Sequence, residues 1–340
     1  MSEPIIGRAG FILAGNYPEH DPATGLAEVL DLVEFGEQAG YQVAGVRQRH
    51  VERGISSALP FLAAASQRTL RIRLETDVVP LGYETPFRLA EDFATVDALS
   101  RGRVNVGVST SAPHADLLAD LARPDAASTT DPYELIERFL TALEGNVLGE
   151  DVATPYGTQS PRVQPHVEGL RSRVWLGGGS ERSVRWTARR GLKLLLGNLA
   201  DGDGHDSFES AQRAHIDLYY QEFAGSGAAV GVERVILPLD STTDEQRAHY
   251  TGYAAARDER TQAAVGPRGT RFGRDLIGTG EQIAERLAAD PAFDGLTELR
   301  VALPYAFTSD EYRQVLGDIV EHVLPHLGWV AASARETVAA

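Results

Sequence analysis

RIRLETDVVPLGYETPFRLAEDFATVDALSRGRVNVGVSTS, residues 71–111, contains two short apolar runs separated by a longer amphipathic segment. The apolar runs at 71–80 and 104–109 predict strands. Residues 86–100 predict a helix that begins with a proline and ends before an Arg-Gly-Arg sequence. The stretch therefore predicts one strand–helix–strand unit.

The same alternation continues in both directions along the chain. Eight strands are predicted, at residues 9–15, 41–46, 71–80, 104–109, 173–178, 192–198, 233–240 and 298–304. Helices are predicted between most of them, at residues 25–40, 58–68, 86–100, 131–145 and 181–191. Repeated units of this kind favour a single (β/α)8 TIM barrel over residues 1–340. An open doubly wound sheet is disfavoured because no glycine fingerprint follows the first strand.

Two segments do not fit a minimal barrel unit. Residues 149–172 are rich in proline and glycine, and residues 201–275 are polar and rich in glycine. Insertions gather where strand-to-helix loops form the active site, so we predict that 201–275 forms a lid of helices and loops there. Arg268, Arg271 and Arg274 are spaced through glycines and would anchor an anionic substrate under that lid. The alternative is a disordered loop in an arginine-biased sequence.

Composition excludes several kinds of chemistry. The chain has no cysteine, which excludes disulfides, thiolate metal sites and cysteine nucleophiles. Of the 32 basic residues only Lys193 is a lysine, and it starts a predicted strand, the wrong end of a barrel for a Schiff base. A net charge of −16 argues against a nucleic-acid partner. No membrane span or signal peptide is apparent, so we expect a cytoplasmic protein.

Residues 174–186, VWLGGGSERSVRW, change from a strand-like run to a helix-like run through three glycines. Glycines at 177–179 let a ligand approach the backbone, and the free amides at a helix start attract phosphate. Ser180 as the N-cap and Ser183 one turn later would add two hydroxyl groups. A tight turn before a capped helix explains the same residues equally well.

Polar side chains also occur near the ends of two predicted strands. Asp77 interrupts an apolar run, where a carboxylate is costly unless it is paired or faces a wet site. Ser109, Thr110 and Ser111 lie at the carboxyl end of the strand at 104–109, which is the catalytic end of a barrel. A solvated loop with a helix cap is the alternative. The histidines show no metal-ligand spacing, so no metal site is predicted.

Three segments resemble the bacterial luciferase-like flavin monooxygenases. TPFRLAEDFATVDALSRGRVNVGVSTS (85–111) is similar to the family's long helix and following strand. WLGGGSERSVRWTARRGLKLLL (175–196) resembles the segment with which the family holds the flavin phosphate. DLIGTGEQIAERLA (275–288) and VLPHL (323–327) resemble its closing units, whereas residues 200–270 resemble it weakly.

The resemblance implies a TIM barrel that binds FMN at the carboxyl ends of its strands. Ser180 and Ser183 would contact the phosphate, and Ser109 would face the reactive edge of the isoalloxazine ring. Asp77 and Val78 fall where the family often has a non-prolyl cis peptide bond. The full set of implied cofactor-binding residues is Asp77, Val78, Ser109, Thr110, Gly178, Gly179, Ser180, Glu181, Arg182 and Ser183.

This chain departs from the family in two places. Thr110 stands where luciferases carry an arginine for the phosphate, so another arginine, such as Arg182, would replace it. RQRHVERG (47–54) stands where they carry a Glu-His or His-His pair, and His50 is the closest match. Imidazole titrates near neutral pH, so His50 joins Ser109 as a candidate catalytic residue; a surface or capping histidine is the alternative.

The resemblance implies a homodimeric monooxygenase in which reduced FMN, supplied by a separate reductase, reacts with O₂. The resulting C4a-peroxyflavin would oxygenate a small organic substrate. Three alternatives stay open. F420, a deazaflavin whose acidic tail needs a basic groove, would give hydride transfer on the same fold. A flavin-binding barrel without turnover, or a phosphate-binding isomerase or lyase with Asp77 as base, would share the glycine turn.

Overall fold

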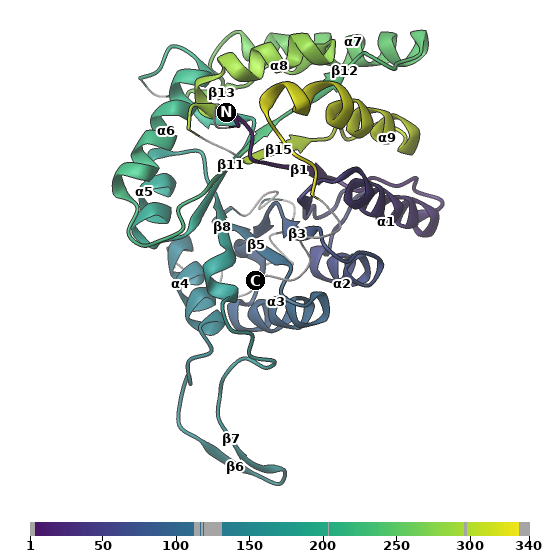
Figure 1. Cartoon of the computed structure of the whole chain (residues 1–340). Helices are drawn as coiled ribbons and strands as arrows, with labels where there is room; N and C mark the ends of the chain where they lie inside the picture. The colour runs from purple at the N-terminus through teal and green to yellow at the C-terminus, as the bar shows by residue number, and fades with distance from the viewer. Residues whose placement is uncertain are drawn as a thin grey trace.

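The computed structural model describes residues 4–111, 116, 118, 131–202, 204–295 and 298–332. Eight parallel strands form a closed barrel, because β3 pairs with β5 and β1 pairs with β15 (Figure 1). Around the barrel they are β1 (Arg8–Leu13), β2 (Val43–Val46), β3 (Arg73–Thr76), β5 (Val104–Ser109), β8 (Val174–Gly177), β9 (Lys193–Leu196), β11 (Val230–Arg234) and β15 (Glu298–Ala302). The predicted (β/α)8 barrel is confirmed.

Helices surround the strands (Figure 1). They are α1 (Pro22–Ala39), α2 (Ala58–Arg68), α3 (Pro86–Ser100), α4 (Pro132–Leu143), α5 (Glu181–Arg189), α6 (Phe208–Glu222), α7 (Asp244–Asp258), α8 (Gly280–Ala289) and α9 (Ser309–Asp318). Single turns of 3-10 or π geometry are η1 (Leu81–Tyr83), η2 (Leu170–Arg173), η3 (Glu259–Thr261), η4 (Pro291–Phe293), η5 (Ile319–Val323) and η6 (Leu324–Leu327). In the part of the chain that the structure describes, the helices are too short or too polar to cross a membrane.

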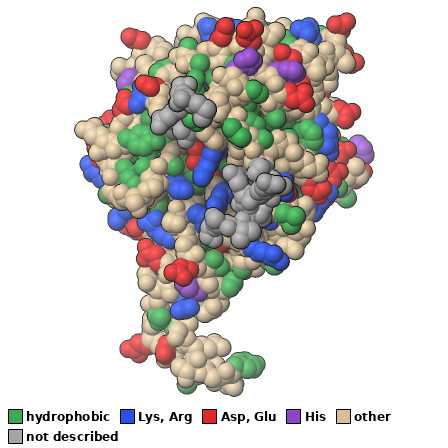
Figure 2. Space-filling view, in the orientation of Figure 1, with side chains coloured by type: hydrophobic (Ala, Val, Ile, Leu, Met, Phe, Trp, Pro, Cys, Tyr) green, Lys and Arg blue, Asp and Glu red, His purple; other side chains and the backbone are tan. Residues whose placement is uncertain are grey.

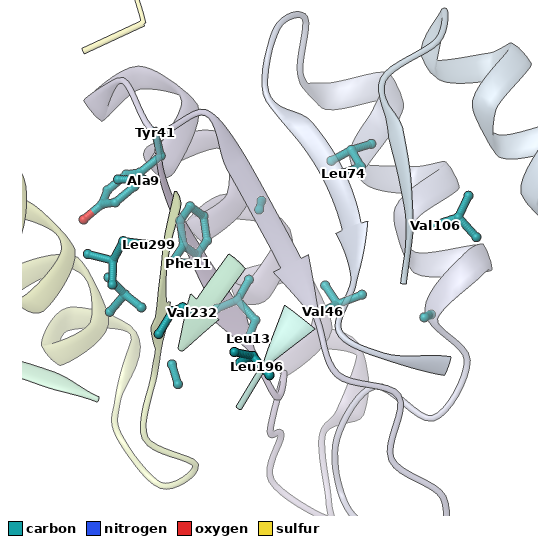
Figure 3. Close-up of a cluster of buried hydrophobic side chains, with 14 of the residues drawn as sticks. Ala9, Phe11, Leu13, Tyr41, Val46, Leu74, Val106, Leu196, Val232 and Leu299 are labelled. Carbon is teal, nitrogen blue, oxygen red and sulfur yellow. The ribbon is translucent and has the colours of Figure 1, made fainter. Parts of the chain in front are cut away.

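The apolar core lies between the strands and the helices, because alternate strand residues point outward from the barrel. Phe11 of β1 is fully buried and packs against Gly36 of α1, where an added Cβ would lie 2.2 Å from the ring. Leu74, Val106 and Leu299 are buried in the same way on other strands (Figure 3). Each such side chain contributes about 1.5–3 kcal/mol to folding, so this layer holds the helices on the barrel.

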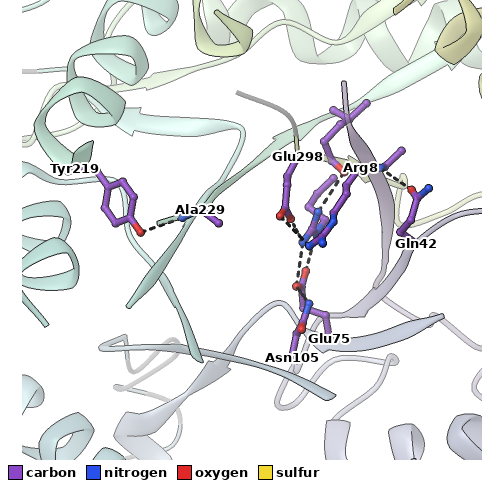
Figure 4. Close-up of polar contacts among 10 residues, drawn as sticks. Arg8, Gln42, Glu75, Asn105, Tyr219, Ala229 and Glu298 are labelled. Carbon is purple, nitrogen blue, oxygen red and sulfur yellow. Dashed lines mark hydrogen bonds and ion pairs between the residues drawn. The ribbon is translucent and has the colours of Figure 1, made fainter. Parts of the chain in front are cut away.

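The inside of the barrel carries a charged layer where this fold usually has aliphatic side chains. Arg300 is fully buried and donates to Glu75 at 2.7 and 3.1 Å and to Glu298 at 3.0 Å. Asn105 donates to Glu75 at 2.8 Å, which extends the network shown in Figure 4. Gly10 makes room for it, because a Cβ there would lie 3.2 Å from the Arg300 Cδ. This layer was not predicted, because its residues come from strands far apart in the sequence.

The stretch at 71–111 folds as predicted except at one point. The helix coincides with α3 and the second strand with β5. The strand predicted at 71–80 is divided into β3 and β4 (Val79–Pro80). Between these strands the peptide bond from Asp77 to Val78 is cis, as the resemblance implies.

The strand predicted at 233–240 is wrong in its bounds. The barrel strand β11 covers Val230–Arg234, and β12 (Ile236–Pro238) leaves the barrel to pair with β14 (Leu276–Gly278). Residues of β12 are buried like those of a barrel strand, which is why an apolar run misplaced the prediction. The correction moves Glu233 from the start of a strand to its carboxyl end.

The two irregular segments contain ordered elements. β6 (Val152–Thr154) and β7 (Gly157–Gln159) form a hairpin that projects from the barrel as a narrow extension (Figures 1 and 2). The segment 201–275 contains the barrel elements α6 and β11, then α7 and β13 (Thr270–Phe272), which pairs with β10 (Leu199–Asp201). Its function as a lid stays a prediction.

Candidate functional site

The strand registers bring three predicted segments together at the carboxyl end of the barrel. Ser109, the last residue of β5, lies opposite Gly177, the last residue of β8, and opposite Pro80 of β4. A Cβ added to Gly177 would lie 3.2 Å from both methyl groups of Val78. The segment around the cis peptide bond, the end of β5 and the glycine turn are therefore neighbours.

Asp77 is the buried acid of this region. Its side chain is 4% exposed, and its Oδ2 atom has no hydrogen-bond partner among the described residues. Burial raises the pKa of the Asp77 carboxyl well above its usual range; Glu233 raises this pKa further, and Arg47 opposes the shift. An uncharged carboxyl group is therefore favoured, and such a group donates a hydrogen bond.

The sequence analysis does not identify the ion pair near Asp77. Arg47 follows β2 and donates to Glu233 of β11 at 2.5 Å, and both side chains are largely buried. Burial lowers the pKa of the Arg47 guanidinium, but Glu233, Tyr305 and Asp77 together outweigh it and the pKa is raised overall. A charged residue directly after a barrel strand is the signal for Arg47. Glu233 was not identified because the strand predicted at 233–240 began at this residue, whereas in the structure Glu233 lies near the end of β11.

The glycine turn leads into a capped helix. Ser180 is the N-cap of α5, and Ser183 completes a reciprocal capping box. The Ser183 N–H donates to Ser180 Oγ at 3.3 Å, and the Ser180 N–H donates to Ser183 Oγ at 3.2 Å. A Cβ on Gly178 would lie 2.6 Å from Ser183 Oγ, so a glycine is needed there. The first helical amides, of Glu181 and Arg182, precede any carbonyl partner within the helix and point toward the turn.

Arg182, suggested above as a replacement phosphate ligand, is engaged with the start of α4. Its guanidinium pairs with Asp131 at 3.0 Å and lies 4.9 Å from the centroid of the Tyr133 ring. The side chain is 69% exposed. These contacts occupy the guanidinium on the outer surface of the molecule.

Arg271 lies much closer to the glycine turn than its sequence position suggests. It stands opposite Ala200 in the β10–β13 pair and packs on Gly202, where a Cβ would lie 2.7 Å from the Arg271 Cγ. Asp201 donates its backbone N–H to the Gly179 carbonyl at 2.7 Å, which joins β10 to the turn. The Arg271 Nε atom is buried without a hydrogen-bond partner, and its guanidinium forms no ion pair with any residue in the described ranges.

The other two arginines of the predicted lid have different surroundings. Arg268 is exposed in the turn between Val265 and Thr270. Arg274 is exposed and lies 3.8 Å from Asp258. Of the three, Arg271 is the one that strand pairing places beside the turn.

His50 lies in the loop after β2. Its ring makes an edge-on contact with Tyr83, with centroids 5.3 Å apart, and its Nε2 lies 3.4 Å from the side-chain nitrogen of Gln48. Gln48 also donates to Glu84 at 3.0 Å, which ties this loop to the loop before α3. His50 is therefore half-buried in a supported loop at the carboxyl end of the barrel.

The predicted hydroxyl cluster forms at the end of β5. Ser109 Oγ lies 2.7 Å from Ser111 Oγ, and Thr110 between them is half-buried. These hydroxyls offer both donors and acceptors next to the glycine turn. Across the described ranges, no group of three or more histidine, aspartate or glutamate side chains is arranged to hold a metal ion.

A cavity of about 550 Å³ opens at the same end of the barrel, between the loops after β1 and β15. In the closed strand order β1 and β15 lie across the barrel from β5 and β8, and the cavity is also lined by residues of α1 and α9. Its lining includes Asn16, Tyr17, Tyr305 and Phe307 and none of the residues predicted from the sequence.

The chain is similar in sequence to a known protein family. Residues 8–295 match the family described as luciferase-like monooxygenase. The chain belongs to the luciferase-like monooxygenase family. The predicted membership in this family of oxidoreductases is thereby confirmed.

Two relatives show how far the sequence likeness extends. 4-Hydroxyprotoasukamycin monooxygenase of Streptomyces nodosus subsp. asukaensis is 36% identical over 132 residues, which are 36% of this chain and 34% of that protein. The match thus spans about a third of that relative. YwcH of Bacillus subtilis strain 168 is 23% identical over 292 residues, which are 78% of this chain and 84% of that protein.

Solved structures with the same fold include proteins of two cofactor types. The oxygenating constituent of 3,6-diketocamphane monooxygenase from Pseudomonas putida, in complex with FMN, has a TM-score of 0.69 and 15% identity, with 94% of this chain and 98% of that chain covered. The coenzyme F420 dependent tetrahydromethanopterin reductase of Methanopyrus kandleri has a TM-score of 0.65 and 16% identity, with 95% and 99% covered. At these identities the likeness is one of fold.

Proposed function

We propose that this luciferase-like protein is a monooxygenase that uses reduced FMN and O₂ to oxygenate a small organic substrate. The observation that carries the proposal is the meeting of Val78, Ser109 and Gly177 at the carboxyl end of the barrel, beside a capped helix start. Reduced flavin, when bound, supplies the electrons that activate O₂. The FMN complex of a protein with this fold supports the choice of cofactor.

The start of α5 fits a phosphate group. The amides of Glu181 and Arg182 and the Ser180 hydroxyl are donors at the positive end of the helix dipole. Arg271 adds a positive charge, because its buried and unpartnered Nε is a donor that a phosphate oxygen would satisfy. We therefore assign the place of the family's phosphate arginine to Arg271, in preference to Arg182.

The surface next to the turn fits a flat ring system. The methyl groups of Val78 are exposed to the space above Gly177 only because residue 177 has no side chain. A larger residue at that position would fill the surface on which an isoalloxazine ring would stack. Ser109 would then present its hydroxyl group to the polar edge of the ring.

Two side chains near this surface are candidates for proton transfer. Burial raises the pKa of the Asp77 carboxyl, which favours its protonated form, and a protonated carboxyl would donate a hydrogen bond to a ligand. Arg47 stays charged because the Glu233 carboxylate pairs with its guanidinium. This ion pair adds polar groups at the carboxyl end of the barrel without adding net charge. His50, in the loop above β2, is the second acid–base candidate.

The remaining parts of the proposal rest on the family resemblance and on composition. A separate reductase would supply reduced FMN, the protein would form a homodimer, and it would work in the cytoplasm. The substrate is a small organic molecule that reaches the carboxyl end of the barrel.

Titration of the purified protein with FMN and with F420, followed by absorbance and fluorescence, tests the proposal. We expect FMN to bind, and Arg271→Gln to weaken its binding, because a hydrogen bond to a charged group contributes about 1.5–3 kcal/mol, roughly tenfold to 150-fold in Kd. Arg268→Gln is the matched control: this exposed arginine lies on the same hairpin and should leave the Kd for FMN unchanged.

Each other outcome selects a different function. Binding of F420 without FMN would indicate hydride transfer. FMN binding without O₂ consumption in the presence of a flavin reductase and candidate substrates would indicate a non-catalytic flavin protein. Binding of neither cofactor would favour the isomerase or lyase alternative.

A further inference from the structure

Four strands begin with a charged residue at the amino end of the barrel, the end away from the proposed flavin site. β1, β3 and β9 begin at Arg8, Arg73 and Lys193, and β15 begins at Glu298. This end thus has three cations for one carboxylate. Glu298 is also shared, because Arg300 binds it at 3.0 Å and Arg8 at 3.4 Å (Figure 4). Positive charge is in excess here although the whole chain carries −16.

Two of the three cations form no ion pair within the described part of the chain. Lys193 makes no hydrogen bond or ion pair with any residue that the structure describes, and its ammonium lies 5.1 Å from the centroid of the Trp175 ring. Arg73 has a buried Nη1 without a hydrogen-bond partner and forms no ion pair in the same ranges. Both side chains are half-buried. Cations withdrawn from water without a paired anion are costly, so an anion bound at this end of the barrel would be stabilised by them.

A cavity of about 350 Å³ opens beside Lys193 and Arg8, and Arg73 is not part of its lining. Its lining consists of Arg8, Lys193, Tyr220, the residues 227–230, Gly295 and Glu298. Pockets that bind small molecules have volumes of about 300–1,000 Å³, so this cavity is large enough for a small ligand but not for a cofactor such as FMN.

We propose that the cavity at the amino end of the barrel binds a small oxyanion (phosphate, sulfate or a dicarboxylate) through Lys193, with Arg8 as the second cation of its lining. The position of the chain's single lysine agrees with this role. Its compact ammonium concentrates charge at one point, whereas a guanidinium spreads it over a plane. Burial lowers the pKa of the Lys193 ammonium, Glu298 opposes this, and Arg8 and Arg73 lower the pKa further. A bound oxyanion relieves that repulsion.

The single lysine makes the site directly observable. Acetylation of Lys193 by an amine-reactive ester, quantified on its own peptide by mass spectrometry, reports the free ammonium group at this one place. We expect phosphate to slow acetylation about tenfold at ten times its Kd, because only about a tenth of the sites are then unliganded. Sodium chloride of equal ionic strength should not slow it. Parallel reactions with sulfate and malonate distinguish an inorganic oxyanion from a carboxylate ligand.

Variants show which side chains the protection of Lys193 from acetylation depends on. Arg8→Gln should weaken it, because this change removes the second cation of the lining. Arg88→Gln, which removes an exposed arginine paired with Asp92 on α3, should retain it. Equal acetylation rates in chloride, phosphate, sulfate and malonate overturn the proposal, and so does full protection in Arg8→Gln. The wild-type comparison needs no variant, so it holds even if Arg8→Gln does not fold. Phosphate bound at the proposed flavin site, at the other end, would not shield Lys193.

Discussion

The two ends of the barrel interior balance their charges in different ways. At the carboxyl end Arg47 is matched by Glu233, and burial raises the pKa of the neighbouring Asp77 carboxyl, which favours its uncharged form. At the amino end Arg73 and Lys193 form no ion pair with a carboxylate among the described residues. A proton donor must hold its proton until the reaction, which a raised pKa favours, whereas an anion site needs cations that the protein has not already paired. One barrel can therefore carry both kinds of site.

The layer formed by Arg300, Glu75 and Glu298 separates the two ends, and removing its cation should have the largest effect. Arg300→Met leaves the Glu75 carboxylate buried without a cation, which costs about 3–5 kcal/mol of unfolding free energy, measured by urea denaturation. The double variant Glu75→Leu/Arg300→Met should recover much of the loss because the orphaned carboxylate is gone. An unchanged unfolding free energy in Arg300→Met would contradict a stabilising role for this charged layer.

Replacing Asp77 by asparagine, which does not titrate, tests the electrostatics at the carboxyl end of the barrel. A raised folded-state pKa means that this residue stabilises the protein fully below its unfolded pKa, near 3.9, and progressively less as the pH rises toward the folded value. Asp77→Asn does not titrate, so its stability relative to wild type should increase with pH, by about 1.4 kcal/mol for each unit of pKa difference. Urea denaturation over a pH series measures this. Parallel curves for the two proteins would contradict a neutral Asp77.

A smaller effect is expected at the glycine turn. Ser180→Ala removes the N-cap of α5, which costs about 0.5–2 kcal/mol of stability, and should also weaken FMN binding. Ser207→Ala is the matched control, because Ser207 and Ser210 form the same capping box at the start of α6. It should cost similar stability and leave flavin affinity unchanged. If both variants bind FMN like wild type, the glycines at 177–179 form only a turn.

The parts of the fold that depend on neighbouring residues were predictable. The helix at 86–100 agrees with α3 residue for residue, and the pattern of eight strands gave the barrel. Ser180 was recognisable as an N-cap because a cap is a local feature. The bounds at 233–240 failed because an apolar run has the same appearance whether it pairs inside the barrel or beside it.

The parts of the site that depend on distant residues were not predictable. Arg271 reaches the glycine turn only through the pairing of β13 with β10, which no spacing in the sequence reveals. The ion pair of Arg47 and Glu233 joins residues 186 positions apart. Charge partners inside a closed barrel come from strands far apart in the chain, so hydrophobic periodicity contains no information about them.

The closure of the barrel has a consequence for how the chain folds. Arg300 comes from the last strand and its partner Glu75 from the third, 225 residues earlier. Loop closure over such a distance is entropically unfavourable before the contacts form. Until β15 docks, the sheet has two open edges and Glu75 lacks its cation. When β15 docks, it closes both edges of the sheet and brings Arg300 to Glu75 in the same step. An incomplete barrel therefore gains little stability, and folding of the barrel approaches an all-or-none event.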